Sequence, residues 1–158
     1  MRGLEIYDIQ KKKVVKKKKF QRINNIVYDN AHDCLYGLFS NGGTQSIVRM
    51  DRDLENPDVI YAFPFGVSVF DMDVSHDGVW LSMTRQGDNG EHTLLLFNTE
   101  ELAKAIFKPV ELVTWDDSNL GQFRFSLDDK YLIGSSYYTG VSNLWQINLE
   151  TREMEMLT

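Results

Sequence analysis

A repeated pattern constrains the fold of this chain more than any other feature of its 158 residues. An apolar stretch that ends in Asp or Asn occurs four times, and intervals of 43, 47 and 50 residues separate its last residues, which are Asp8, Asp51, Asn98 and Asn148. A polar turn recurs between these stretches, and intervals of 45 and 51 residues separate its aligned positions, which are Asp33, Gly78 and Asp129. The two markers agree on one period, which indicates a series of similar supersecondary units.

Each repeat is predicted to form four short strands. In the clearest hairpin, apolar residues alternate from Phe70 to Val74, the turn Ser75–Gly78 follows, and a second apolar run occupies 79–83. This order is typical of a tight antiparallel hairpin. An aliphatic or aromatic third strand, a polar turn and a fourth strand complete the unit. Four antiparallel strands in every repeat predict an all-β fold, a partial β-propeller of four-stranded antiparallel blades.

The whole chain, residues 1–158, is predicted to be a single partial propeller domain. A short helical insertion is expected near 99–106, where Thr99 precedes good helix formers and would be the N-cap. The predicted units are a half-blade at 4–20 and complete blades at 21–61, 66–115 and 120–158. A closed propeller needs about four to eight complete blades. We therefore expect the chain to be a segment of a longer protein.

The two ends of this segment are predicted to expose apolar surface. In a closed propeller each blade packs against two neighbours, and exposed apolar patches larger than a few hundred Å² promote association. The residues expected on the open faces are Leu4, Ile6, Val14 and Phe20 at one end and Phe123, Phe125, Leu132 and Trp145 at the other. Self-association through the open blade ends is therefore expected.

Residues 122–158 resemble the WD-like repeat of the TolB-type β-propellers. Phe125–Leu132 is similar to the aromatic-Ser-Pro-Asp-Gly-Lys turn of that repeat, and Ser142–Thr151 is similar to its apolar strand and the polar turn that follows. Leu127 stands where the repeat usually has Pro, and Asp129 stands where it has Gly. The resemblance implies a propeller fold, and a periplasmic or secreted location if it holds for the parent protein. It does not imply an activity, because one fold hosts many functions.

Charge is distributed unevenly along the chain. Seven lysines lie between Lys11 and Lys19, whereas from Phe20 onward 21 acidic residues outnumber nine basic ones. An acidic body repels a phosphate backbone, so nucleic-acid binding by the folded domain is not expected. The lysine run is interpreted as an outermost edge strand, where lysines discourage pairing with other strands. A docking or targeting segment is the alternative interpretation.

Neither a membrane span nor a disulfide is predicted. The sequence has no uncharged apolar run of about 18 residues, and residues 1–30 lack the apolar stretch of a signal peptide. Cys34 is the only cysteine, which excludes an internal disulfide and a cysteine-based zinc cluster. The cellular compartment is left open by these features.

The polar residues contain no motif for catalysis or metal binding. The stretch Asp71–Asp77 alternates polar residues like a calcium loop, but His76 stands where that loop requires glycine. The histidines lack the spacing of a zinc site, and neither Gly-x-Ser-x-Gly nor a phosphate-binding loop occurs. We therefore predict no catalytic residue, no metal and no cofactor. A weaker alternative is an enzyme site in the propeller channel, lined by Asp71, Asp73 and Arg124.

The candidate binding surface is the propeller face that carries the loops between second and third strands and the connections between blades. The expected loops are 40–46, 84–92 and 135–141, and the expected connections are 63–66 and 115–122. Aromatic and Arg side chains in such loops tend to anchor interfaces, although Trp115 and the tyrosines could instead cover blade junctions. We expect a non-catalytic segment that binds a protein or peptide or acts as a scaffold. The alternative is an accessory propeller of a larger hydrolase of the serine-peptidase type, with its catalytic residues outside this chain. The predicted loop-face residues are Arg85, Asp88, His92, Trp115, Asp116, Asp117, Tyr137 and Tyr138.

Overall fold

The computed structural model describes residues 3–19, 22–116 and 120–158. In these residues the strands form one two-stranded and three four-stranded antiparallel sheets, and each sheet uses strands that are consecutive in the sequence. The two-stranded sheet contains β1 (Leu4–Asp8) and β2 (Lys13–Lys18). The next sheet contains β3 (Ile23–Asp29), β4 (Cys34–Asn41), β5 (Thr44–Asp51) and β6 (Asp58–Ala62). The third contains β7 (Ser68–Val74), β8 (Trp80–Gln86), β9 (His92–Asn98) and β10 (Val110–Trp115). The last contains β11 (Leu120–Phe125), β12 (Tyr131–Ser136), β13 (Asn143–Asn148) and β14 (Met154–Met156).

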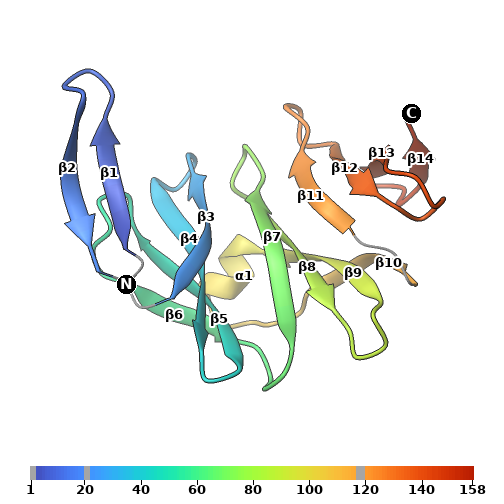
Figure 1. Cartoon of the computed structure of the whole chain (residues 1–158), viewed down its shortest axis with the longest axis horizontal. Helices are drawn as coiled ribbons and strands as arrows, with labels where there is room; N and C mark the ends of the chain where they lie inside the picture. Colours follow the sequence, from blue (N-terminus) through green and yellow to red (C-terminus); the bar gives the residue numbers. More distant parts are fainter. Residues whose placement is uncertain (1–2, 20–21, 117–119) are drawn as a thin grey trace.

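The sheets follow one another along an arc, from β1–β2 near the N-terminus to β11–β14 near the C-terminus (Figure 1). The first strand of each four-stranded sheet lies on the inner side, and β7 contacts both β3 and β11. The predicted all-β fold, a partial propeller of four-stranded antiparallel blades, is confirmed.

Each inner strand contains the same irregularity. Its pairing with the next strand shifts by one residue in β3, β7 and β11. At each shift a residue other than glycine has a positive φ, and the three residues are Asn25 (48°), Asp71 (53°) and Gln122 (43°). A bulge of this kind bends a strand and redirects its side chains. The repeat seen in the sequence is therefore also a repeat of backbone conformation.

The apolar cores lie between neighbouring sheets, and they bury residues that the sequence placed on open faces. Phe123 and Leu132 are 1% and 0% exposed in the core shared by β7–β10 and β11–β14, which also contains Phe125 and Trp145. Leu4 and Ile6 pack against the cluster Val48, Met50 and Leu54 of the next sheet. The predicted open faces were therefore wrong at both ends. Alternation shows which residues share a face, but it does not show which neighbour that face meets. Val14 is partly buried, and Phe20 lies outside the described residues.

One helix, α1 (Thr99–Ala103), occurs in the described residues, within the segment predicted to be helical. Its N-cap is Asn98 rather than Thr99, because the Asn98 side chain accepts a hydrogen bond from the backbone N–H of Glu101 at 3.0 Å. The Thr99 hydroxyl donates instead to the carbonyl of Gly78 at 2.5 Å, which attaches the helix to the β7–β8 turn. No helix in the described part of the chain is long and apolar enough to cross a membrane.

The loops are shorter than the sequence predicted. A loop expected at 40–46 is reduced to a turn at 42–43, because the pairing of β4 with β5 continues to Asn41 and Thr44. The loop expected at 84–92 is likewise reduced, since Gln86 still pairs with His92. Polar residues at these strand ends indicated loops, but backbone pairing continues through them because it does not require apolar side chains.

Candidate functional site

A groove with a volume of about 530 Å³ runs across the inner strands of the three four-stranded sheets. Val27 of β3, Asp73 of β7 and Arg124 of β11 occupy the same register position in their strands. The repeat thus places an apolar, an acidic and a basic side chain side by side. The lining also includes Tyr28, Val74, Ser75, His76 and Phe125.

Asp73 and Arg124 give the groove its charges. The Asp73 carboxylate accepts a hydrogen bond from the backbone N–H of Phe125 at 2.9 Å, which joins β7 to β11. Burial raises the pKa of Asp73, and it outweighs the lowering by this N–H and by the positive charge of Arg124. The Arg124 guanidinium donates to the carbonyls of Met72 at 3.4 Å and Phe123 at 3.0 Å. Opposite charges in one partly desolvated groove can orient a ligand that carries both.

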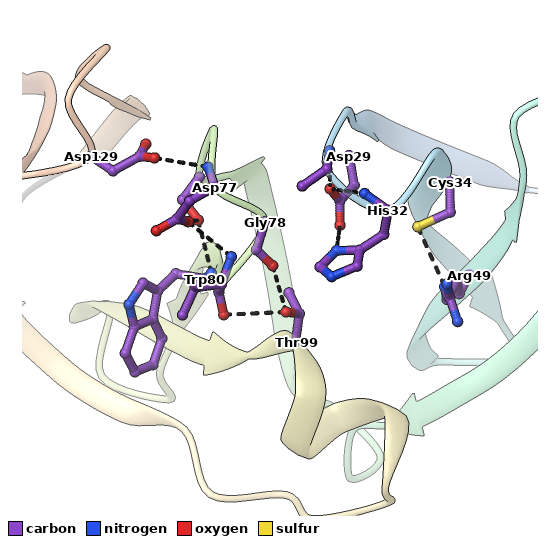
Figure 2. Close-up of polar contacts among 12 residues, drawn as sticks. Asp29, His32, Cys34, Arg49, Asp77, Gly78, Trp80, Thr99 and Asp129 are labelled. Atoms are coloured by element: carbon purple, nitrogen blue, oxygen red, sulfur yellow. Dashed lines mark hydrogen bonds and ion pairs between the residues drawn. The ribbon is translucent and has the colours of Figure 1, made fainter.

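The turns above the groove are joined by Asp129. Its carboxylate accepts hydrogen bonds from the backbone N–H groups of His76 and Asp77, each at 2.9 Å, and from Nδ1 of His76 at 2.9 Å. Figure 2 shows Asp129 reaching across to the turn that contains Asp77 and Gly78. The hydrogen bond to Asp129 raises the pKa of His76, although partial burial acts against it. For Asp129 itself, burial acts to raise the pKa, but the hydrogen bonds from His76 and Asp77 outweigh it and the pKa is lowered.

Two more polar side chains join neighbouring sheets at the inner strands. The Gln45 amide of β5 accepts from the backbone N–H of Val69 at 2.6 Å and donates to the carbonyl of the same residue at 3.1 Å. Asp71 accepts from the backbone N–H of Gln122 at 3.2 Å. Of the three residues suggested for a channel site, Asp73 and Arg124 therefore meet in the groove, whereas Asp71 connects the bulges of β7 and β11.

The predicted loop-face residues fall into different environments. Arg85 lies on β8 and forms an ion pair with Glu111 at 2.9 Å, and Asp88 is exposed in the β8–β9 turn. His92 is 5% exposed, and its ring and the Phe70 ring form a T-shaped contact at a centroid distance of 5.4 Å. Trp115, the last residue of β10, is 2% exposed. His92 and Trp115 therefore contribute to sheet packing in the described chain.

The remaining loop-face residues lie nearer to solvent. Tyr137 and Tyr138 are 57% and 58% exposed in the β12–β13 loop, and the Tyr138 ring meets Trp145 edge to face at a centroid distance of 6.3 Å. Asp116 is exposed, and Asp117 lies outside the described residues. A binding role for the loop face stays a prediction, with the two tyrosines as its most accessible aromatic residues.

The sequence did not single out Tyr28, His76 or Asp129 for the groove or its rim. Tyr28 is 44% exposed and donates its hydroxyl to Asp33 at 2.5 Å. The sequence feature that could have located the groove is the alignment of the repeats, because the aligned inner strands place Val27, Asp73 and Arg124 together. In the described residues, no group of three His, Cys, Asp or Glu side chains could hold a metal ion.

Comparison with known proteins supports the fold. No family model matches the chain, and no curated protein matches it. Among solved structures, TolB from Acinetobacter baumannii aligns over 99% of this chain and 37% of its own, with a TM-score of 0.74 and 17% identity. An oligogalacturonate lyase in complex with manganese aligns over 96% of this chain and 40% of its own, with a TM-score of 0.68 and 12% identity. The β-propeller domain of the Trilobed protease from Pyrococcus furiosus aligns over 88% and 43%, with a TM-score of 0.65 and 12% identity.

The chain is thus a partial β-propeller, and its sheets have the arrangement seen in TolB-like propellers. It spans less than half the length of each of these three structures. The low identities limit the likeness to the fold, which hosts many functions.

Proposed function

We propose that this chain is a propeller segment that binds a protein or peptide in the inner-strand groove without catalysing a reaction on it. The observation that carries the proposal is the meeting of Asp73 and Arg124 with the apolar side chains Val27, Val74 and Phe125. An extended peptide can place apolar side chains against the strands and charged ones against the carboxylate and the guanidinium.

The proposal that the chain does not catalyse a reaction rests on the hydrogen bonds of three aspartate side chains. Asp71, Asp73 and Asp129 each accept backbone N–H groups of a neighbouring sheet, so their carboxylates stabilise sheet junctions. A general base has to reach a proton of the substrate, and oxygens of these carboxylates already accept backbone N–H groups of the protein. We expect no turnover of broad ester and peptide substrates by the chain at high concentration. Turnover that is lost with Ser135→Ala or Ser136→Ala would contradict this.

Peptide selection tests the binding proposal. A displayed library of random peptides is selected on the full chain, and the affinity of enriched peptides is measured for three variants. Asp73→Asn keeps an oxygen for the Phe125 N–H but removes the charge, and we expect it to weaken binding of peptides with a basic residue about tenfold, or ~1.4 kcal/mol. Glu100→Gln, at an exposed position of α1 outside the groove and the loop face, is the control and should bind like the wild type.

The third variant, Tyr137→Ala with Tyr138→Ala, examines the loop face predicted from the sequence. If it alone loses binding, the partner contacts the loop face and the groove proposal is wrong. The absence of any enriched peptide would contradict peptide binding at the groove and at the loop face.

An accessory propeller of a larger hydrolase is the second candidate function. It is supported by the structural likeness to the propeller domain of a protease. The reading frame of the parent gene tests it: a downstream Gly-x-Ser-x-Gly with later Asp and His favours a hydrolase, whereas further propeller repeats without it favour a binding protein.

A further inference from the structure

A small cavity lies between the β3–β6 sheet and α1, at a junction between two complete sheets. Its volume is about 160 Å³, and its lining consists of His32, Tyr36, Arg49, Thr99, Glu100 and Ala103. The first of these belongs to the β3–β4 turn, the next two pair across β4 and β5, and the last three belong to α1. The helix inserted between β9 and β10 thus forms one wall of the cavity, and the preceding sheet forms the other.

Arg49 is held in this lining through its Nε atom. That nitrogen donates a hydrogen bond to Sγ of Cys34 at 3.3 Å, and Cys34 is 3% exposed. In the part of the chain that the structure describes, no hydrogen bond or ion pair engages the two terminal nitrogens of Arg49. A guanidinium held in this way can present one N–H from each terminal nitrogen to the two oxygens of a carboxylate.

His32 is oriented by Asp29. Nδ1 of the His32 ring lies 2.8 Å from Oδ2 of Asp29, and Asp29 is 0% exposed. The Asp29 carboxylate also accepts the backbone N–H groups of Ala31 and His32, at 3.0 and 3.1 Å, which fixes the turn. When both ring nitrogens of His32 carry a proton, Nδ1 donates to Asp29 and the N–H at Nε2 points away from it. Figure 2 shows His32 and Arg49 on the same side of α1, each with the residue that holds it.

The charges and the size of the cavity favour a small ligand with one negative charge. Arg49 and a protonated His32 supply the positive charge. Glu100 lines the same cavity and forms an ion pair with Lys104 at 3.5 Å, and an adjoining cavity of about 210 Å³ is lined by two aspartates. These carboxylates would repel a dianion such as phosphate more strongly than a monoanion. The volume of the first cavity equals that of about five water molecules at ~30 Å³ each, which suits an acid of a few heavy atoms.

We propose that this cavity binds a small carboxylic acid, with the carboxylate on the terminal nitrogens of Arg49 and on Nε2 of His32. The carbon atoms of the acid then lie against the remaining lining, which includes Ala103. Arg49 and Glu100 are exposed, so the acid can enter from solvent. The described residues that line this cavity differ from those that line the inner-strand groove. The proposal therefore does not depend on peptide binding in that groove.

A titration followed by nuclear magnetic resonance tests the proposal. Sodium propionate is added to the full chain in mildly acidic buffer, where histidine can be protonated, and the side-chain resonances of Arg49 and His32 are followed. We expect saturable shifts of both, with a dissociation constant on the order of 1 mM. Arg49→Gln removes the charge and should weaken binding about tenfold. Arg49→Lys keeps the charge without the two terminal nitrogens and should weaken binding less.

Arg52→Gln is the matched control, because Arg52 forms an ion pair with Asp33 at 3.4 Å and is not among the described residues that line either cavity. This variant should bind propionate like the wild type, and propionamide, which lacks the charge, should not bind the wild type. The absence of saturable shifts at Arg49 and His32 would overturn the proposal, as would equal binding of propionamide or equal binding by Arg49→Gln. Tighter binding of inorganic phosphate than of propionate would overturn the assignment to a carboxylate.

Discussion

Asp129 accepts a hydrogen bond from the backbone N–H of His76 at 2.9 Å, across the junction between β7–β10 and β11–β14. The two residues are 53 positions apart in the sequence. Asp129 has a φ of 55°, in the left-handed region that Asp enters more readily than most residues. Asp129 stands where the TolB-type repeat usually has glycine, and here the side chain at this position joins two sheets.

Asp129→Asn should therefore destabilise the chain. Asparagine tolerates the same backbone conformation but has a single acceptor oxygen, so one of the N–H groups of His76 and Asp77 would lose its partner. We expect a loss of about 1–3 kcal/mol in the free energy of unfolding by urea. Asp88→Asn, in an exposed turn, is the control and should change the midpoint little. Equal effects of the two substitutions would contradict the role of Asp129.

The same contact should make stability depend on pH. Asp129 raises the pKa of His76, and the carboxylates of Asp73 and Asp77 add to the effect. A raised pKa means that the contribution of His76 is complete below its unfolded value of about 6.5 and is lost as the pH rises through the folded value. The unfolding free energy of the wild type, relative to His76→Gln, should thus fall as the pH rises from about 6.5 through the folded pKa of His76. A difference that stays constant or rises over this interval would refute the contact.

Gly78 is expected to be required at the junction between β3–β6 and β7–β10. It has a φ of 74°, and a Cβ added there would lie 2.7 Å from the Cβ of Ala31 and 2.8 Å from the His32 ring. Gly90 has a φ of 89° with open space around it, so Gly90→Ala measures the backbone strain alone, about 1–2 kcal/mol. Gly78→Ala should cost measurably more in the same urea titration. An equal cost would show that the two turns do not pack together.

Phe123 should contribute strongly to stability. It is 1% exposed, and its ring packs against Trp115 at a centroid distance of 5.7 Å. Phe123→Ala should lower the unfolding free energy by about 3–5 kcal/mol. Leu144→Ala, at a position of the same sheet that is 45% exposed, is the control and should lower it by about 0.5 kcal/mol or less. A larger effect of Leu144→Ala than of Phe123→Ala would show that Phe123 lies on the open face of the sheet, as the sequence suggested.

Local sequence signals predicted the strands and their order. The turn Ser75–Gly78 was predicted from its residue types, and the structure ends β7 at Val74 and begins β8 at Trp80. The Ser75 hydroxyl explains this turn, because it accepts the backbone N–H of Trp80 at 2.8 Å and donates to Asp77 at 2.6 Å. Such contacts span few residues, so their signal is present in a short segment.

Contacts between sheets could not be predicted in the same way. The pairs Gln45 with Val69 and Asp73 with Phe125 join residues 24 and 52 positions apart. Their formation depends on the twist of each sheet and on the bulges of the inner strands, neither of which leaves a distinct residue pattern. His92 shows the same limit, because the polar stretch 84–92 suggested a loop whereas continued pairing of β8 with β9 places His92 in a buried position.

Hydrogen–deuterium exchange of the chain, with and without a peptide selected on it, tests the proposed binding groove most directly. We predict that the peptide slows exchange at 27–30, 73–76 and 124–125, the segments of β3, β7, β11 and the turns after β3 and β7 that line the groove. Exchange at 137–142, in the β12–β13 loop, should stay unchanged. Slower exchange confined to that loop, or no change in the three inner segments, would contradict the account.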